Sequence, residues 1–127
     1  LELANLDMAG KRVAFWGGTG KCAAFLQAHH ADAQRFPLVV DSDPDKAGTY
    51  VPGTGQQIQF RDALLEQRPE VIIVPTQWRA RDIVEEAARA GITYQSLLIP
   101  HNGHLVDYFT AAHPYRKPSL TKEPALV

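Results

Sequence analysis

The chain has 127 residues, 45% of them hydrophobic, which suffices for one packed core and is too short for two ordinary domains. Thirteen basic and fourteen acidic residues give a formal net charge of −1, without the basic cluster that nucleic-acid binding generally needs. Apolar runs such as Val71–Pro75 are far shorter than the roughly 20 residues that span a bilayer, and the N-terminus lacks the basic start and apolar core of a signal peptide. The single cysteine fits a reducing compartment, so we expect a cytoplasmic protein that binds neither nucleic acid nor membranes.

Stretches of strand length alternate with stretches of helical period along most of the chain. The predicted elements, in chain order, are strand Arg12–Trp16, helix Lys21–Ala31, strand Pro37–Asp41, strand Gln57–Phe60, helix Arg61–Gln67, strand Glu70–Pro75, helix Ala80–Ala90 and strand Gln95–Ile99. The second and fourth strands are continuously apolar, as strands buried on both faces are. Ser42–Gln56 is a long Gly/Pro-rich connection, of a length usually reserved for functional loops.

This alternation is typical of βαβ units around a parallel sheet. Short right-handed crossovers predict an α/β, Rossmann-like fold with about five parallel strands in the order 3-2-1-4-5 and helices on both faces. We assign residues 1–10 to an N-terminal lead-in and 11–108 to the domain. Residues 109–127 contain Pro114, Pro118 and Pro124 and no helical or strand period, so we expect a C-terminal tail or linker there.

A glycine turn follows the first predicted strand. Gly18-Thr19-Gly20-Lys21-Cys22-Ala23 fits the pattern G-x-G-x-x-A at the start of a helix, where glycines let the backbone approach a diphosphate and the helix N-terminus supplies unpaired N–H groups. Asp41 ends the second strand, where dinucleotide folds often place the acid that binds a ribose hydroxyl. We therefore predict ligand binding by Gly18, Thr19, Gly20, Lys21 and Asp41. In the alternative, the glycines serve only the turn and the aspartate only ends its strand.

Thr76, Gln77 and Trp78 follow the fourth strand, which the predicted topology places beside the first. Trp78 offers a stacking face and Gln77 an amide that both donates and accepts, so these three residues are predicted to complete a ligand crevice with the glycine turn. The alternative roles are equally concrete, because Thr76 can cap the following helix and Trp78 can cover its first turn.

Other candidate chemistry is weakly supported. The histidine pairs His29-His30 and His101-His104 have no cysteine or carboxylate partners that complete a zinc set, so His101–His104 is interpreted as a polar turn and no metal is predicted. Cys22 has no base identified as its partner, and no catalytic residue is predicted. Charged residues of the last helix, Glu85, Glu86 and Arg89, are expected on its solvated face.

The long connection carries the most specific pattern. "DSDPDKAGTYVPGTGQQI" resembles a segment of the C-terminal domain of S-adenosylmethionine (SAM)-dependent sugar C-methyltransferases and related proteins. The matching positions are Asp41, Pro44, Lys46, Gly48, Pro52, Gly53, Thr54 and Ile58, with Trp16-Gly17-Gly18 and Lys21 matching the run after the first strand. The family also tends to have Trp-Asn after its fourth strand, and this chain keeps Trp78 but has Arg79 in place of Asn. The resemblance spans roughly residues 11–100.

The resemblance implies an accessory role. In such enzymes SAM and the catalytic residues belong mainly to a separate preceding domain, and the C-terminal domain helps to enclose the nucleotide-sugar substrate. The chain is then expected to bind a nucleotide or nucleotide sugar as a non-catalytic domain, with SAM supplied only by an upstream domain. Two alternatives stay open: an independent NAD- or nucleotide-binding sensing module, and a small stand-alone enzyme. For the first, the chain resembles the NAD- or nucleotide-binding Rossmann domains found beside sugar-nucleotide dehydratases, in topology and in the "VDSDP" turn.

Overall fold

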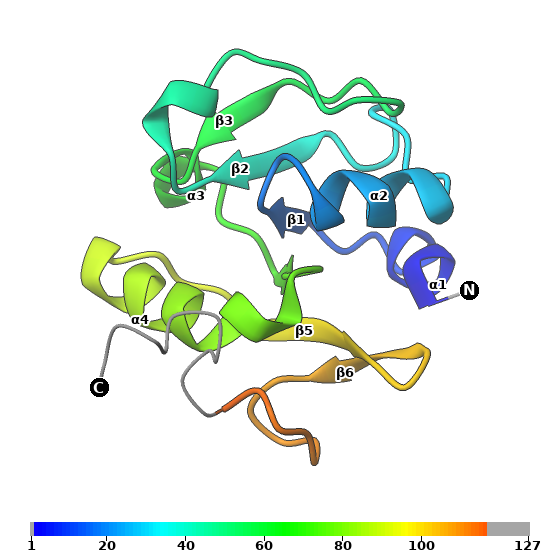
Figure 1. The fold of residues 1–127 in the computed structure, drawn as a ribbon, viewed down its shortest axis with the longest axis vertical. Helices are drawn as coiled ribbons and strands as arrows, with labels where there is room; N and C mark the ends of the chain where they lie inside the picture. The colour runs from blue at the N-terminus through cyan, green and yellow to red at the C-terminus, as the bar shows by residue number, and fades with distance from the viewer. Residues whose placement is uncertain (1, 117–127) are drawn as a thin grey trace.

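A six-stranded sheet runs through the centre of the computed structural model, which describes residues 2–116 (Figure 1). The strands are β1 (Val13–Trp16), β2 (Leu38–Asp41), β3 (Ile58–Phe60), β4 (Val71–Ile73), β5 (Ser96–His101) and β6 (His104–Asp107). Their order is β3-β2-β1-β4-β5-β6; the first five are parallel to one another, and β6 is antiparallel to β5. The predicted α/β, Rossmann-like fold and its 3-2-1-4-5 order are confirmed.

Helices cover both faces of this sheet, as predicted. They are α1 (Glu2–Met8), α2 (Lys21–Ala28), α3 (Ala63–Glu66) and α4 (Ala80–Ala90), with short 3₁₀ turns η1 (Pro44–Lys46) and η2 (Gln77–Arg79). Successive side chains of a strand point to opposite faces. Accordingly Phe15 of β1 packs in one cluster with α1 and α2, whereas its neighbours Ala14 and Trp16 pack in the other with α3 and α4. The apolar stripe of α4 and its left-handed end at Gly91 fall where the sequence predicts them.

The chain leaves the middle strands in opposite directions. After β1 it enters α2 on one face, and after β4 it enters η2 and α4 on the other face. Since β1 and β4 are neighbours, this is the topological switch point, and the carboxyl ends of the strands there are separated by a crevice in folds of this kind. The sheet thus sets where a ligand site is expected.

The sixth strand was not predicted from the sequence. β5 continues to His101 and turns through Asn102 and Gly103, whose φ angles of 50° and 79° make the two-residue turn that joins antiparallel strands. The polar-turn interpretation of His101–His104 holds, but β6 is a short edge strand without the apolar run by which strands are recognised. The predicted lead-in also contains a helix, α1, which buries Leu3.

The segment after β6 returns to the sheet. Tyr108 is buried in the core cluster that contains α4, and the rings of His113 and Tyr115 lie 5.8 Å apart, nearly parallel. His113 Nδ1 accepts a hydrogen bond from the Tyr115 N–H. The remainder of the predicted tail, residues 117–127, lies outside the described residues.

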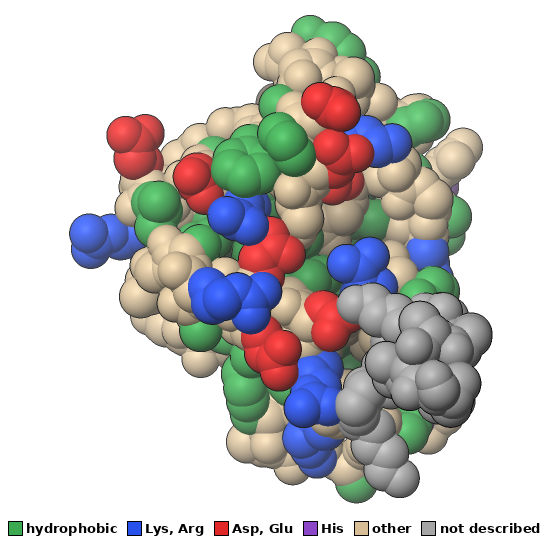
Figure 2. Space-filling model, turned by 60° about the vertical axis from the view of Figure 1, so that its left-hand side comes forward, with side chains coloured by type: hydrophobic (Ala, Val, Ile, Leu, Met, Phe, Trp, Pro, Cys, Tyr) green, Lys and Arg blue, Asp and Glu red, His purple; other side chains and the backbone are tan. Residues whose placement is uncertain are grey.

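Surface charges are mixed in sign. On the face in Figure 2, acidic and basic side chains lie next to one another. On α4 this mixing takes the form of Arg81 paired with Glu85. Within residues 2–116, no helix is both long enough and apolar enough to cross a membrane.

Candidate functional site

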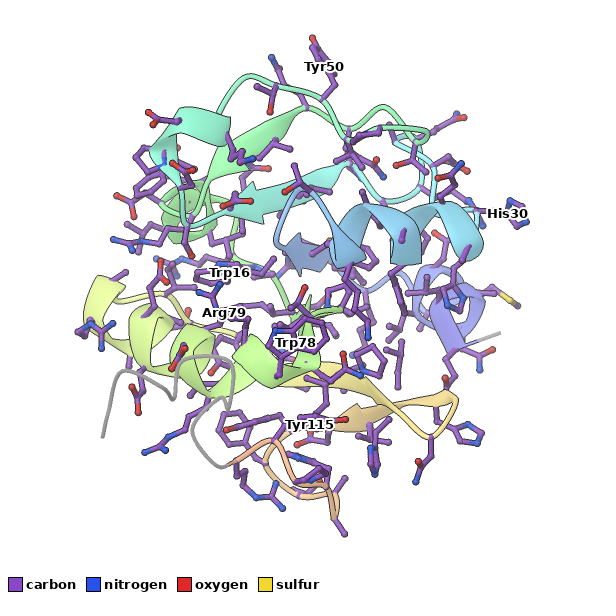
Figure 3. All side chains as sticks on the ribbon, in the orientation of Figure 1. Trp16, His30, Tyr50, Trp78, Arg79 and Tyr115 are labelled. Atoms are coloured by element: carbon purple, nitrogen blue, oxygen red, sulfur yellow. The ribbon has the colours of Figure 1, made fainter. Side chains whose placement is uncertain are left out.

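A crevice of about 250 Å³ lies at the carboxyl ends of β1 and β2. Its lining residues come from three segments that are distant in sequence: Trp16, Gly17, Thr19, Asp41, Ser42, Asp43, Lys46, Thr76, Arg79 and Ile83. Figure 3 shows Trp16 and Arg79 close together near the centre of the molecule. Of the eight residues predicted from sequence, Thr19, Asp41 and Thr76 line this crevice directly.

The carboxylate of Asp41 fastens the glycine turn to the end of β2. Its Oδ2 accepts a hydrogen bond from the Gly18 N–H at 2.9 Å, and its Oδ1 accepts one from the Asp43 N–H at 2.9 Å. The Gly18 N–H is therefore already used within the protein. A carboxylate has about four acceptor positions, so Asp41 retains capacity for a ligand hydroxyl.

Glycine is required at positions 18 and 20 for different structural reasons. A Cβ on Gly18 would lie 2.3 Å from Ile58 Cδ1, so the turn needs glycine there to pack against β3. Gly20 has a φ of 59° and nothing within 4 Å of its Cβ position, so its need is conformational. It precedes α2, whose first N–H groups have no partner within the helix.

Cys22, the second residue of α2, lies in surroundings that disfavour its reactive thiolate form. Its side chain is fully buried, and burial, with a smaller contribution from the charge of Asp41, raises the pKa of the thiol to about 12. The thiolate that nucleophilic attack requires is thus scarce at neutral pH.

Lys21 and Trp78 meet beside the crevice instead of lining it. The Lys21 ammonium lies 5.0 Å from the centroid of the Trp78 ring, whose side chain is 38% exposed. This cation–π contact joins the start of α2 to η2 across the switch point. Gln77 also lies outside the lining, and its Oε1 is buried without a hydrogen-bond partner in the part of the chain described.

The sequence-based site prediction missed two cationic lining residues. Lys46 ends η1, a turn started by Pro44 and capped by the Asp43 carboxylate, which accepts from the Asp45 N–H at 2.9 Å. Arg79 ends η2 on the other side. Lys46 belongs to the family-like segment and Arg79 replaces the family's Asn, so the available signal was the resemblance, not the glycine motif.

A hydrogen-bonded chain stands behind one wall of the crevice. Trp16 Nε1–H donates to Ser42 Oγ at 2.9 Å, and the Ser42 hydroxyl donates to Glu86 Oε1 at 2.9 Å. Arg61 Nη1 donates to Glu86 Oε2 at 2.6 Å, and this bond raises the pKa of the Arg61 guanidinium. The expectation that Glu86 lies on a solvated face is wrong: its side chain is 15% exposed, whereas that of Glu85 is 52% exposed, because Glu86 faces the sheet ends.

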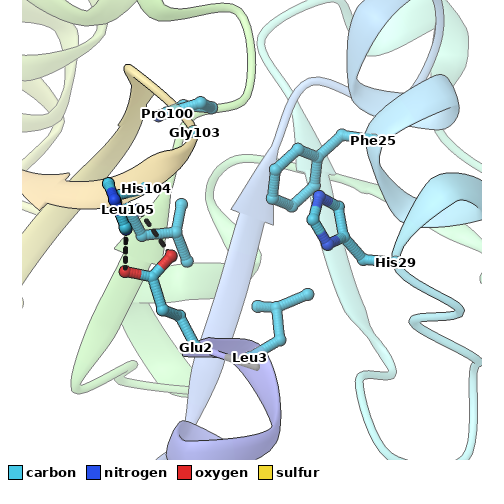
Figure 4. Close-up of a pocket in the computed structure, with 8 residues that line it drawn as sticks. All are labelled: Glu2, Leu3, Phe25, His29, Pro100, Gly103, His104 and Leu105. Atoms are coloured by element: carbon cyan, nitrogen blue, oxygen red, sulfur yellow. Dashed lines mark hydrogen bonds and ion pairs between the residues drawn. The ribbon is translucent and has the colours of Figure 1, made fainter.

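A second cavity, of about 430 Å³, lies between α1, α2 and the β5–β6 hairpin (Figure 4). Its walls are mainly apolar and include Leu3, Phe25 and Leu105. The Glu2 carboxylate on its rim accepts from the Leu105 N–H at 2.8 Å. This cavity contains none of the residues predicted from sequence. Across residues 2–116, no group of three or more His, Cys, Asp or Glu side chains is placed to hold a metal ion.

These features define the class of the protein. A doubly wound, mostly parallel sheet with a glycine turn after β1 and an aspartate at the end of β2 is a Rossmann-like domain. The chain belongs to the family of C-methyltransferase C-terminal domains, whose family model matches residues 2–99. The resemblance noted in the sequence is thereby confirmed.

One similar solved structure agrees with the fold. UDP-D-quinovosamine 4-dehydrogenase from Vibrio fischeri matches with 16% identity and a TM-score of 0.55, over 79% of this chain and 94% of that one. RSP, a Rex-family repressor, matches with 17% identity and a TM-score of 0.45, over 83% of this chain and 56% of its own. A structure of RSP in complex with beta-NADH matches with 18% identity and the same TM-score of 0.45. No curated protein matches the chain.

Proposed function

We propose that this domain binds a nucleotide or nucleotide sugar in the crevice, as the substrate-enclosing accessory domain of a methyltransferase-like enzyme. The observation that supports it is the meeting, in one crevice of about 250 Å³, of the glycine turn, the acidic end of β2 and two cationic side chains. One structural neighbour, UDP-D-quinovosamine 4-dehydrogenase, is named for a UDP-sugar, which agrees with this ligand class. The unpaired Cys22 fits the reducing cytoplasm, where we propose that the domain acts.

The lining suits a ligand that carries both phosphate and hydroxyl groups. Lys46 and Arg79 supply positive charge for phosphoryl oxygens, to which the free N–H groups at the start of α2 add further donors. Asp41 accepts hydrogen bonds from sugar hydroxyls, and the Thr19 and Thr76 hydroxyls both donate and accept. Beside the crevice, we propose that Trp78 stacks on a base or a sugar ring, with Gly18, Gly20, Lys21 and Gln77 shaping the same wall.

We further propose that the domain contributes binding and another domain contributes the chemistry. The buried, protonated Cys22 supplies no nucleophile. The family consists of C-terminal domains of C-methyltransferases, which supports a partner domain upstream. SAM would be held by that domain and not by the glycine turn. The G-x-G-x-G pattern of SAM methyltransferases would need three glycines here, and Trp16 occupies the position of the first, before Gly18 and Gly20.

Isothermal titration calorimetry of this chain with UDP-glucose, NAD and SAM tests the proposal. We expect saturable binding of UDP-glucose and none of SAM. Lys46→Gln and Arg79→Gln should each weaken UDP-glucose binding about tenfold, since each removes a charge-assisted contact. Arg89→Gln is the matched control, because Arg89 is an exposed cation of α4 outside the crevice lining. Unchanged affinity in both crevice variants would contradict the site.

One observation favours a second candidate, an independent NAD-binding sensing module. Asp41 stands at the end of β2, where dinucleotide-binding folds place the residue that binds the adenosine ribose. Binding of NAD, together with no binding of UDP-glucose, would favour this candidate. Asp41→Ala should then weaken NAD binding. Failure of all three compounds to bind would contradict both candidates for this chain.

A further inference from the structure

Glu86 lies at the end of a hydrogen-bond chain that the crevice lining alone does not reveal. Its two carboxylate oxygens accept from different donors, the Ser42 hydroxyl at 2.9 Å and the Arg61 guanidinium at 2.6 Å. The Glu86 side chain is 15% exposed and that of Arg61 28% exposed. A carboxylate so shielded is costly unless its oxygens are hydrogen-bonded, and here both are.

Both donor residues are also connected to the backbone of Asp41. Ser42 follows Asp41 in the chain, and the Arg61 backbone N–H donates to the Asp41 carbonyl oxygen at 3.1 Å. A closed ring results, from the Asp41 carbonyl through Arg61 and Glu86 to Ser42 and covalently back to Asp41. The Trp16 indole N–H, donating to Ser42 Oγ, attaches this ring to β1.

The ring includes the backbone of Asp41, whose carboxylate accepts from the Gly18 and Asp43 N–H groups. We propose that Glu86 is a positioning residue that fixes the Asp41 carboxylate against the glycine turn and thereby keeps the crevice ready for its ligand. The effect on affinity rests on the nucleotide-binding function proposed above. The effect on Asp41 itself does not depend on any ligand.

A role of Glu86 in stability alone predicts a different experimental result. If Glu86 only fastened α4 to the sheet, its removal would lower stability and change the Trp16 indole environment but leave the bond between Gly18 and Asp41 intact. The backbone amide protons of Gly18 and Asp43 therefore report on positioning. Neither residue contacts Glu86 through a hydrogen bond of its own.

The experiment compares Glu86→Gln with Glu85→Gln in the full 127-residue chain. Glutamine keeps the shape of Glu86 but has one acceptor oxygen and no charge, so it cannot accept from both the Ser42 hydroxyl and the Arg61 guanidinium on separate oxygens, and its bond to Arg61 is no longer an ion pair. Glu85 is the matched control, because it adjoins Glu86 on α4, is 52% exposed and pairs with Arg81. Amide hydrogen exchange by NMR is measured at Gly18 and Asp43, and UDP-glucose affinity by calorimetry.

In Glu86→Gln we expect exchange at Gly18 and Asp43 to accelerate about tenfold and UDP-glucose affinity to fall about tenfold, the effect of losing one hydrogen bond to a charged group. Glu85→Gln should change neither quantity. Unchanged exchange in Glu86→Gln overturns the inference even if the melting temperature falls. Unchanged affinity, with wild-type binding established, overturns it as well.

A second variant covers the case in which Glu86→Gln fails to fold. Ser42→Ala removes the hydroxyl that links Glu86 to the Asp41 backbone but leaves the ion pair between Glu86 and Arg61. It should accelerate exchange at Gly18 to a similar extent, and no acceleration would overturn the inference. If the wild-type chain does not bind UDP-glucose, the proposed function fails, while the exchange measurements still decide whether Glu86 positions Asp41.

Discussion

Asp41 illustrates how one side chain can serve the fold and the site together. Sequence spacing assigned its carboxylate to a ligand hydroxyl, whereas in the structure each of its oxygens accepts a backbone N–H of the protein, from Gly18 and from Asp43. Those bonds set the shape of the glycine turn. Its proposed contact with a ligand uses the acceptor positions that remain.

Replacing Asp41 should therefore affect stability even without a ligand. Asp41→Ala leaves the Gly18 and Asp43 N–H groups without their acceptor and should lower the free energy of unfolding by about 1–3 kcal/mol. Asp41→Asn, which keeps one acceptor oxygen, should lower it less. Urea unfolding followed by circular dichroism measures both, and Asp45→Ala, at an exposed position in η1, is the control. Equal stability of Asp41→Ala and wild type would show that these bonds contribute nothing.

Cys22 gives the fold a dependence on alkaline pH. Its pKa is raised from 9.0 to about 12 by burial, so the folded thiol stays neutral while the unfolded thiol ionises. Stability is thus fully present below pH 9 and is lost as the pH rises toward 12. The pKa values of Tyr94 and Tyr108 are also raised, mainly by burial, and add to this loss above about pH 10.

We expect the urea midpoint of the wild type to fall between pH 8 and pH 10.5 by more than that of Cys22→Ala. The variant lacks the ionising thiol but retains both tyrosines, so the difference between the two slopes isolates Cys22. Alkylation of the native thiol by iodoacetamide at pH 8 should be correspondingly slow and should accelerate in urea. Parallel pH profiles, or rapid alkylation of the folded chain, would refute the burial of this thiol.

At the scale of elements, the β5–β6 hairpin depends on its two-residue turn. Asn102 and Gly103 both have positive φ angles, of 50° and 79°, which asparagine and glycine tolerate better than other residues. β6 covers the edge of an otherwise parallel sheet and carries Leu105, whose N–H is tied to Glu2 of α1. The turn thus influences both β6 and the docking of α1.

Gly103→Ala should lower the free energy of unfolding by about 1 kcal/mol, because alanine is strained at this φ angle. Asn102→Gly is the control, and it should change the stability by only a few tenths of that amount, since glycine adopts the same φ without strain. Urea denaturation curves measure both variants. If the free energy of unfolding of Gly103→Ala equals that of the wild type, the hairpin does not depend on this turn.

For the whole molecule, one sheet supports two apolar clusters. Each strand contributes alternate side chains to the two faces, so the two clusters share one sheet. Loss of packing in one cluster therefore disrupts the sheet against which the other cluster packs. A single domain of this size generally unfolds in one transition. The cavities and the crevice lie around this shared sheet, not in a separate unit.

We therefore expect coincident urea transitions from two probes. In Trp78→Phe, the tryptophan fluorescence comes from buried Trp16, while far-UV circular dichroism follows the helices. Normalised curves from the two probes should superimpose within error. A fluorescence transition at clearly lower urea than the circular dichroism transition would contradict a single cooperative unit.

The apolar strand runs and the helical period of Ala80–Ala90 were sufficient to predict the order of the first five strands and the helices on both faces. These patterns are local, and the handedness of the crossovers then leaves few topologies. β6 and α1 were missed, because a short edge strand and a seven-residue terminal helix bury too few side chains to leave a periodic signal. The family resemblance was also visible in the sequence, in the segment that begins at Asp41.

The sequence by itself determined the fold class, the family and the location of the crevice at the switch point, because chain order and hydrophobic pattern fix which strand ends meet. Only the tertiary structure decided which side chains line that crevice. Thr19, Asp41 and Thr76 do, Trp78 instead meets Lys21 beside it, and Lys46 and Arg79 join from the turns η1 and η2. Only the folded chain turns Glu86 from the solvent toward Ser42 and Arg61. Such pairings join residues far apart in sequence, and their distances depend on packing that no local pattern encodes.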